Sequence, residues 1–253
     1  MKIALVGAGN VATCMGPRLK AAGHDIVCVY SRTMQSASVL AERLGAVAVT
    51  DLAAMPQADV YLTMLKDDAL LALAPDIVKG RDGLFLHTAG SIPMSVWSDA
   101  GASNCGVLYV MQTFSKTSVI EWDKVTAFIE GTSDSIRELA SDLTPNVVSL
   151  SSEGRRRLHL AAVFANNFSN HMFAVSQRLL EKEGVPFSVM LPLIREGVRK
   201  LDTMNPSDAQ TGPAVRGDRQ TMNSHVRLLA GNPQLQELYT LITDIIQQKT
   251  SGK

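Results

Sequence analysis

A glycine-rich turn near the N-terminus constrains the fold more than any other feature. The sequence GAGNVA, residues 7–12, follows a short apolar run, Lys2–Val6, and opens a helical pattern, Asn10–Ala22. At such a turn Gly7 permits a tight bend and Gly9 lets the backbone approach a pyrophosphate. Free N–H groups and the positive end of the helix dipole then face the phosphates. The turn predicts a dinucleotide site formed by Gly7, Ala8, Gly9, Asn10 and Val11, and the alternative is a plain strand-to-helix turn.

Short apolar runs alternate with helical patterns up to about residue 150. The predicted strands are Lys2–Val6, Ile26–Tyr30, Val47–Val49, Val60–Leu65, Leu84–His87 and Val107–Met111, with edge strands at Val125–Ile129 and Val147–Leu150. Helical patterns between them include Met34–Leu44 and Ser133–Leu143. Strands separated by helices form parallel units with both faces of the sheet covered. We therefore expect an α/β domain over residues 1–151, with a doubly wound, mostly parallel (Rossmann) sheet.

From about residue 152 the pattern is helical only. The predicted helices are Glu153–Glu183, Pro186–Met204 with a kink at Pro192, one from Asp218 to Gly231, and Leu235–Gln248. Residues 152–253 therefore form an all-helical domain, which we expect to bind substrate and to dimerise. The first of these helices is apolar on more than one face, and such a helix is buried on several sides. A homodimer is the common solution.

The end of the second strand distinguishes NAD from NADP. An acidic residue there binds the ribose 2′-hydroxyl of NAD. This chain has Ser31, Arg32 and Thr33 instead, which offer a guanidinium and two hydroxyl groups to a 2′-phosphate. NADP is the expected cofactor. The alternative is a solvated Arg32 beside a helix-capping Thr33, and the two are compatible.

Three further segments leave the same carboxyl edge of the sheet, where ligands bind in open α/β folds. Lys66 follows the fourth strand and is a candidate catalytic and cofactor-binding residue near the ribose or the nicotinamide, and a neighbouring aspartate is the expected cap of the next helix. His87 ends the fifth strand and is a candidate proton donor beside the cofactor, which it is also expected to contact, or else a structural histidine. Ser91, Gln112 and Thr113 are candidates to orient a substrate oxygen.

Two polar elements lie in the helical half. Asn166, Asn167 and Asn170 form a stripe that shares a helix face by i,i+3 and i,i+4 spacing. It serves either substrate hydrogen bonding or contacts between helices or subunits; Asn167 is a candidate catalytic residue, Asn166 and Asn170 substrate ligands. Arg216 is a candidate clamp for a substrate carboxylate, with turn chemistry as the alternative. The basic run 155–157 reads as a solvated face.

Charge and cysteine content narrow the class of protein. Lys+Arg and Asp+Glu number 24 each, so the sequence lacks the positive excess of a broad nucleic-acid-binding face. Its three cysteines match no zinc spacing and close no disulfide framework, as in reduced cytosolic proteins. No apolar run reaches the roughly 18 residues of a membrane helix. We expect a cytoplasmic protein with a small-molecule substrate, and no metal, nucleic acid or membrane.

The motifs GAGNVA, LKDD, HTAGS, MQTFS, AAVFANNFSNH and QTGPAVRGD together resemble a family of oxidoreductases. Its members pair a Rossmann-like NADP-binding domain with a helical domain of uncharacterised function. The family is distantly similar to pyrroline-5-carboxylate reductases, ketopantoate reductases and 6-phosphogluconate dehydrogenases. In that wider group the helical domain commonly dimerises, and several members use a lysine of the long helix as proton donor. This chain departs from them, because it has no lysine between Gly154 and Glu181.

Two functions compete on these observations. The first is an NADPH-dependent reductase that transfers hydride to a small carbonyl or imine compound, such as a 2-keto acid. Its site is expected in the cleft between the two halves. The second is a non-catalytic NADP-binding regulator or scaffold, which the missing lysine favours.

Overall fold

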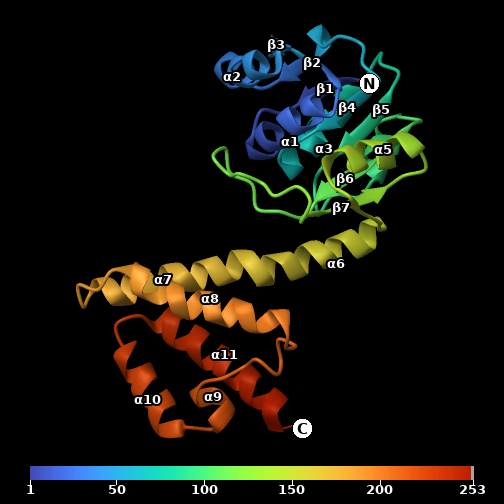
Figure 1. The fold of residues 1–253 in the computed structure, drawn as a ribbon. Helices are drawn as coiled ribbons and strands as arrows, with labels where there is room; N and C mark the ends of the chain where they lie inside the picture. Colours follow the sequence, from blue (N-terminus) through green and yellow to red (C-terminus); the bar gives the residue numbers. More distant parts are fainter. Residues whose placement is uncertain (252–253) are drawn as a thin grey trace. The chain divides into compact units, whose positions relative to one another are not determined.

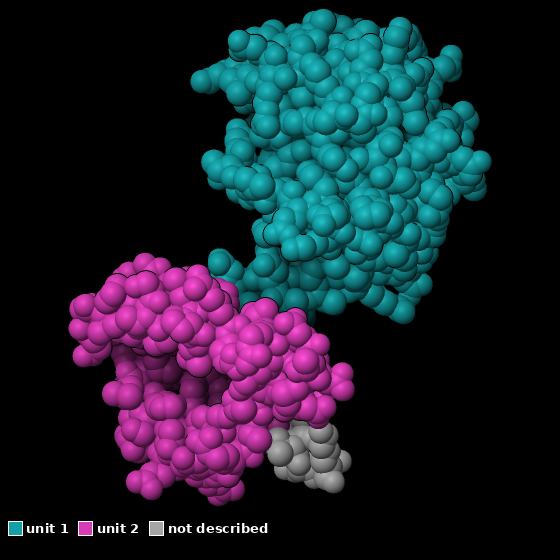
Figure 2. Space-filling model, viewed as in Figure 1, with its two compact units in different colours: residues 1–171 teal, residues 172–253 magenta. Residues whose placement is uncertain are grey.

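The computed structural model describes residues 1–251 and forms two compact units, Met1–His171 (unit 1) and Met172–Lys253 (unit 2) (Figures 1 and 2). The predicted division at residue 151 falls where the last strand, ending at Ser149, gives way to a helix beginning at Ser152. Unit 1 continues some way along that helical run. The separate functions assigned to residues 1–151 and 152–253 stay predictions.

Unit 1 is built on one eight-stranded sheet with the order β3-β2-β1-β4-β5-β6-β7-β8 (Figure 1). All neighbours are parallel except β6 and β7, which are antiparallel. This confirms the predicted doubly wound, mostly parallel sheet and its two added strands. The bounds are β1 Lys2–Val6, β2 Asp25–Tyr30, β3 Val47–Val49, β4 Val60–Thr63, β5 Leu84–His87, β6 Cys105–Val110, β7 Thr126–Glu130 and β8 Asn146–Ser149.

Helices cover both faces of the sheet, as the buried apolar strands require. One face packs against α1 (Asn10–Ala21), α2 (Met34–Leu44) and α5 (Asp134–Leu143). The other packs against η1 (Leu52–Ala54), α3 (Asp67–Val78) and α4 (Ser95–Asp99). The order reverses between β1 and β4, so the chain leaves β1 and β4 in opposite lateral directions at the carboxyl edge. That edge is where such folds bind ligands.

The long helix predicted from Glu153 to Glu183 is interrupted. It consists of α6 (Ser152–Ala162), a π-helical turn η2 (Val163–Phe168) and α7 (Ser169–Glu181). A π-helix bonds i to i+5, so the shared face that we inferred from i,i+4 spacing does not hold across this turn. Such turns occur often at functional sites.

Unit 2 is helical, as predicted, but two of its details differ. Pro192 does not kink a helix: it lies in the first turn of α8 (Leu191–Arg199), where its missing N–H costs nothing. The loop around residue 214 holds a short helix, α9 (Pro213–Arg216). The other elements are η3 (Phe187–Met190), η4 (Lys200–Asp202), α10 (Arg219–Leu228), capped by Asp218 as predicted, and α11 (Pro233–Ser251). Within the described residues, no helix combines the length and the apolar character that crossing a bilayer demands.

Candidate functional site

The first glycine of the turn after β1 is required by close packing. Gly7 has φ +122°, and a Cβ there would lie 2.5 Å from the carbonyl oxygen of Met64, just past β4. Its N–H donates to the carbonyl of Tyr30 at the end of β2. Gly7 therefore holds together the carboxyl ends of three neighbouring strands.

The second glycine faces open space. Gly9 is the N-cap of α1 and supplies no side-chain cap, and no described atom lies within 4 Å of a Cβ built on it. The first N–H groups of the helix, from Asn10 onward, thus keep room for an anion. The Asn10 side chain itself donates to the carbonyl of Phe114 at 3.0 Å, so the loop after β6 lies against the start of α1. An uncapped N-terminus with empty space above it fits a dinucleotide phosphate.

The end of β2 keeps its basic group free. The backbone N–H of Ser31 donates to Val49, and Thr33 caps α2 by accepting from the N–H of Ser36. The Arg32 side chain is exposed and makes no hydrogen bond or ion pair with any described residue. Capping by Thr33 and an available guanidinium at Arg32 therefore coexist.

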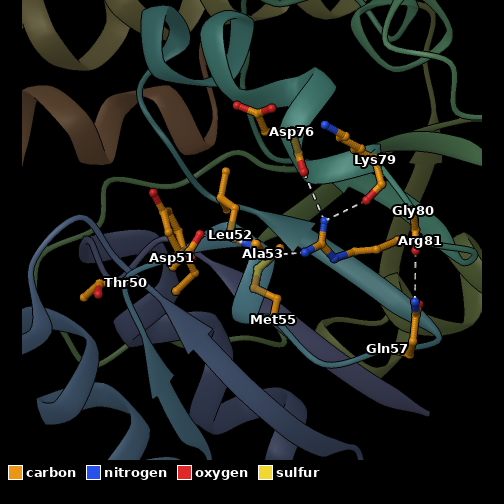
Figure 3. Close-up of a pocket in the computed structure, with 11 residues that line it drawn as sticks. Thr50, Asp51, Leu52, Ala53, Met55, Gln57, Asp76, Lys79, Gly80 and Arg81 are labelled. Carbon is orange, nitrogen blue, oxygen red and sulfur yellow. Dashed lines mark hydrogen bonds between the residues drawn. The ribbon is translucent and has the colours of Figure 1, made fainter.

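A pocket of about 720 Å³ opens beside the end of β2, between η1 and the end of α3 (Figure 3). The guanidinium of Arg81 forms part of its wall and donates to the carbonyls of Leu52, Asp76 and Lys79. Gln57 donates to the carbonyl of Gly80. Because these polar side chains are engaged with the main chain, we place the candidate chemical centre elsewhere, at the ends of β4, β5 and β6.

Lys66 occupies the N-cap position of α3, and its side chain is exposed. Asp67 and Asp68 lie in the first turn of that helix rather than capping it, so the predicted cap was wrong. Their negative charges interact favourably with the positive end of the helix dipole. Lys66 thus stands free at the carboxyl end of β4.

His87 is fully buried at the end of β5. Its Nδ1 accepts a hydrogen bond from the N–H of Ala89 at 3.2 Å, and Nε2 faces the backbone carbonyl of Pro93 without reaching good hydrogen-bond geometry. Burial lowers the pKa of His87 to about 3, and the positive charge of Arg155 acts in the same direction. The imidazole is therefore neutral at pH 7.

The remaining predicted residues of the carboxyl edge are exposed. Ser91 follows β5, and Gln112 and Thr113 follow β6. The Gln112 Oε1 accepts from the backbone N–H of Thr113 at 2.7 Å, which leaves its amide NH₂ free to donate. These groups and Lys66 leave neighbouring strands at the same edge, as the sequence predicts.

The prediction that the basic run at the start of α6 is a solvated face is wrong for Arg155. Arg155 is 1% exposed, and its guanidinium donates to the Glu130 carboxylate of β7 and to the carbonyl of Ile92, each at 2.5 Å. Glu130 also accepts from the N–H and the hydroxyl of Ser152. Burial alone would raise the pKa of Glu130, but these hydrogen bonds outweigh it and the pKa is lowered. The two neighbouring arginines are exposed, as predicted.

One turn further along α6, a tyrosine and a histidine meet. The Tyr109 hydroxyl on β6 lies 3.2 Å from Nδ1 of His159, with the rings edge to face. His159 also packs on Gly90 of the HTAGS segment, where a Cβ would lie 2.5 Å from Nδ1. Neither residue is assigned a role from the sequence, and the one sequence signal for Tyr109 is a phenol in an otherwise apolar strand.

The asparagine stripe is exposed. Asn166 and Asn167 lie in the π-helical turn and Asn170 in α7, all in unit 1. Arg216 is exposed and belongs to α9 of unit 2, so its part in the site stays a prediction. Among the described residues, no group of three or more His, Cys, Asp or Glu side chains is arranged to hold a metal ion.

Two family descriptions match separate parts of the chain. Residues 2–85 match the family described as NADP oxidoreductase, coenzyme F420-dependent, and residues 124–246 match a domain of unknown function, DUF2520. This pair confirms the predicted resemblance, a Rossmann-like NADP-binding domain followed by an uncharacterised helical domain.

Known proteins agree with this pairing. A crystal structure from Bacteroides fragilis, assigned as an NADP oxidoreductase, is 45% identical, with a TM-score of 0.92 and 98% of each chain covered. An imine reductase from Myxococcus stipitatus, in complex with NADP+, is 15% identical with a TM-score of 0.71 over 100% of this chain and 95% of that one, which shows the shared fold. A Bacillus subtilis protein, "Uncharacterized oxidoreductase YfjR", is 34% identical over 84 residues. That match spans 33% of this chain and only 28% of the relative.

Proposed function

Because the chain belongs to the family of NADP oxidoreductases that includes the Bacteroides fragilis protein, we propose that it reduces a small carbonyl or imine compound with NADPH. A 2-keto acid is the first substrate class to test. The observation that carries the proposal is the shared carboxyl edge: the open N-terminus of α1, the free Arg32 and the polar ends of β4, β5 and β6 all lie along it.

When bound, NADPH supplies the hydride. The chain's own residues bind and orient the reactants. The N–H groups at residues 9–11 bind the pyrophosphate, and Ser31, Arg32 and Thr33 bind the 2′-phosphate. Lys66 interacts with the ribose or the nicotinamide side of the site.

The substrate is held by hydrogen bonds from two elements, the carboxyl edge of the sheet and the helical run that continues α6. Ser91, Gln112 and Thr113 orient the oxygen or nitrogen that becomes protonated, and Asn166, Asn167 and Asn170 bind the rest of the molecule. A neutral, fully buried His87 is a poor proton source at pH 7. We therefore assign His87 to positioning the HTAGS turn through the N–H of Ala89.

A turnover screen tests this function. Purified protein is incubated with NADPH and with pyruvate, ketopantoate or 1-pyrroline, and absorbance of NADPH at 340 nm is followed. We expect oxidation of NADPH with at least one compound, together with the matching alcohol or amine product. If NADPH binds but is consumed with none of the three, the reductase proposal fails for these classes.

The competing function is a non-catalytic NADP-binding regulator. It is favoured by the absence of a lysine between Gly154 and Glu181, the position from which several similar reductases draw a proton. A regulator binds NADPH with no turnover and changes its association with another protein when NADPH is added. The screen above therefore separates the two functions.

Cofactor preference gives a first prediction. NADPH binds more tightly than NADH, and Arg32→Asp lowers NADPH affinity by roughly tenfold, because it replaces a phosphate ligand by a repelling charge at an exposed, screened position. NADH affinity changes little. Fluorescence titration of both cofactors measures the effect, with Arg195→Asp, an exposed change of the same charge in α8, as the control. Equal affinities in the parent protein would contradict the prediction.

Oligomeric state gives a second prediction. Leu160 is 57% exposed, Phe164 62% and Phe168 49%, and the two phenylalanine rings pack edge to face at 4.9 Å. A second copy of the chain covers this apolar surface in a symmetric dimer. Light scattering at micromolar concentration should give twice the 27.2 kDa chain mass, and Phe164→Asp should shift the mass toward the monomer. A parent protein of monomer mass would exclude this dimer.

A further inference from the structure

Reduction of a carbonyl or of a neutral imine needs a proton as well as a hydride. The proposed function leaves the source of that proton open, since His87 is buried and neutral and α6 carries no lysine. We propose that Tyr109 and His159 deliver it: the Tyr109 hydroxyl protonates the substrate oxygen or nitrogen, and His159 restores the proton to Tyr109. This inference rests on the proposed reductase function.

The first argument is position. His87, the last residue of β5, pairs with Val107 of β6, and Tyr109 lies two residues further toward the carboxyl edge. The MQTFS segment, residues 111–115, begins two residues after Tyr109. His159 packs on Gly90 of the HTAGS segment. The pair therefore bridges the two segments proposed to hold the reacting group.

The second argument is the state of the phenol. Tyr109 is partly buried, and burial raises its pKa, while the charge of Arg155 opposes that rise. The phenol thus keeps its proton at neutral pH, as a donor must. Its oxygen lies 3.2 Å from Nδ1 of His159, within hydrogen-bond distance, so the proton can be replaced.

The third argument is the glycine beneath the histidine. A side chain at position 90 would place Cβ 2.5 Å from Nδ1 and 2.6 Å from Cγ of His159. The imidazole can stand beside Tyr109 only because residue 90 has no Cβ. Gly90→Ala therefore displaces the ring without removing either functional group.

The proton balance closes with solvent as the source. As hydride reaches the carbonyl or imine carbon, the double bond opens and its oxygen or nitrogen takes the proton from the Tyr109 hydroxyl. The Nδ1–H of His159 passes its proton to the tyrosine oxygen. The partly exposed imidazole takes a proton from water at Nε2, and exchange of its ring protons with solvent restores the Nδ1–H form before the next turnover. One hydride and one solvent proton are added to the substrate.

The test compares Tyr109→Phe and His159→Gln with the parent, using whichever of pyruvate, ketopantoate and 1-pyrroline the parent reduces. Loss of a general acid costs on the order of 100-fold or more in rate, so kcat of Tyr109→Phe should fall by about that factor. NADPH affinity, measured by fluorescence, should stay within about twofold, since neither group binds the cofactor phosphates. In ¹⁵N-histidine NMR spectra of the ligand-free protein, Tyr109→Phe should shift the Nδ1 signal of His159, identified by its loss in His159→Gln.

A matched pair in unit 2 provides the control. The Tyr239 hydroxyl lies 2.8 Å from Nδ1 of His225, also edge to face. Tyr239→Phe should move the His225 signal and leave kcat unchanged. If the parent turns over and Tyr109→Phe retains its kcat, the proton pair is overturned while the reductase function stands. If the parent reduces none of the three probes, the reductase function and the proton pair are both contradicted.

Discussion

Replacing Arg155 by alanine is expected to lower the free energy of unfolding by about 3–5 kcal/mol, the usual cost of removing one partner of a buried ion pair. The guanidinium is 1% exposed, and the Glu130 side chain that pairs with it is 18% exposed. Alanine would leave that carboxylate poorly solvated and would also strip the Ile92 carbonyl of its donor. Urea denaturation followed by circular dichroism measures the loss.

The matched control for Arg155 lies two residues away. Arg157 also pairs with a glutamate, Glu153, but the two side chains are 79% and 66% exposed. An exposed i,i+4 pair contributes about 0.3–0.5 kcal/mol, so Arg157→Ala should hardly change the free energy of unfolding. If the two alanine variants lowered the free energy of unfolding equally, burial of the Arg155 pair would make no contribution to stability.

The same ion pair has a defined pH dependence. The pKa of Glu130 is lowered in the folded state, so its stabilisation is present above the unfolded-state pKa and is lost as pH falls through the folded-state value. The stability difference between the parent and Arg155→Ala should therefore shrink in acid. Urea midpoints measured across the acidic range report this change.

Gly9→Ala is expected to keep the fold and to lose cofactor affinity, by at least roughly tenfold, or about 1.4 kcal/mol. A Cβ at this position meets no described atom within 4 Å, and the backbone φ of −83° suits alanine. The methyl group instead occupies the space that the pyrophosphate needs over the start of α1. Thermal unfolding without ligand and fluorescence titration with NADPH separate the two effects.

Substitutions at two other glycines serve as comparisons for Gly9→Ala. Gly197→Ala in α8 adds a methyl group that also meets no described atom within 4 Å, and should leave NADPH affinity unchanged. Gly7→Ala should instead destabilise the fold, because its Cβ would lie 2.5 Å from a backbone carbonyl. If Gly9→Ala bound NADPH as tightly as the parent protein, the proposal that this turn binds the pyrophosphate would be wrong.

The sheet could be predicted because its signals are local. The bounds of β1, β5 and α2 match the predicted ranges Lys2–Val6, Leu84–His87 and Met34–Leu44, where apolar runs and turn residues follow one another along the chain. The carboxyl edge followed from the parallel order alone. Positions of Lys66, Gln112 and Thr113 at that edge could therefore be stated before any coordinates.

What could not be predicted depends on partners distant in sequence. Arg155 stands in a run of three arginines that looks like a solvated surface, and its carboxylate partner lies 25 residues earlier. The contact of Tyr109 with His159 joins residues 50 positions apart. The π-helical turn at Val163–Phe168 leaves no pattern that distinguishes it from an α-helix of the same composition.

Because the ion pair at Arg155 anchors α6, the number of residues that follow Arg155 determines where the later side chains of the helix lie. Arg155 fixes both its height along β7 and its rotation, and His159 follows one turn later, about 6 Å along the axis. Inserting or deleting one residue between them would turn the imidazole by about 100° away from Tyr109. Substitutions there can be tolerated where changes in length cannot, so the number of residues from anchor to imidazole matters more than their identity.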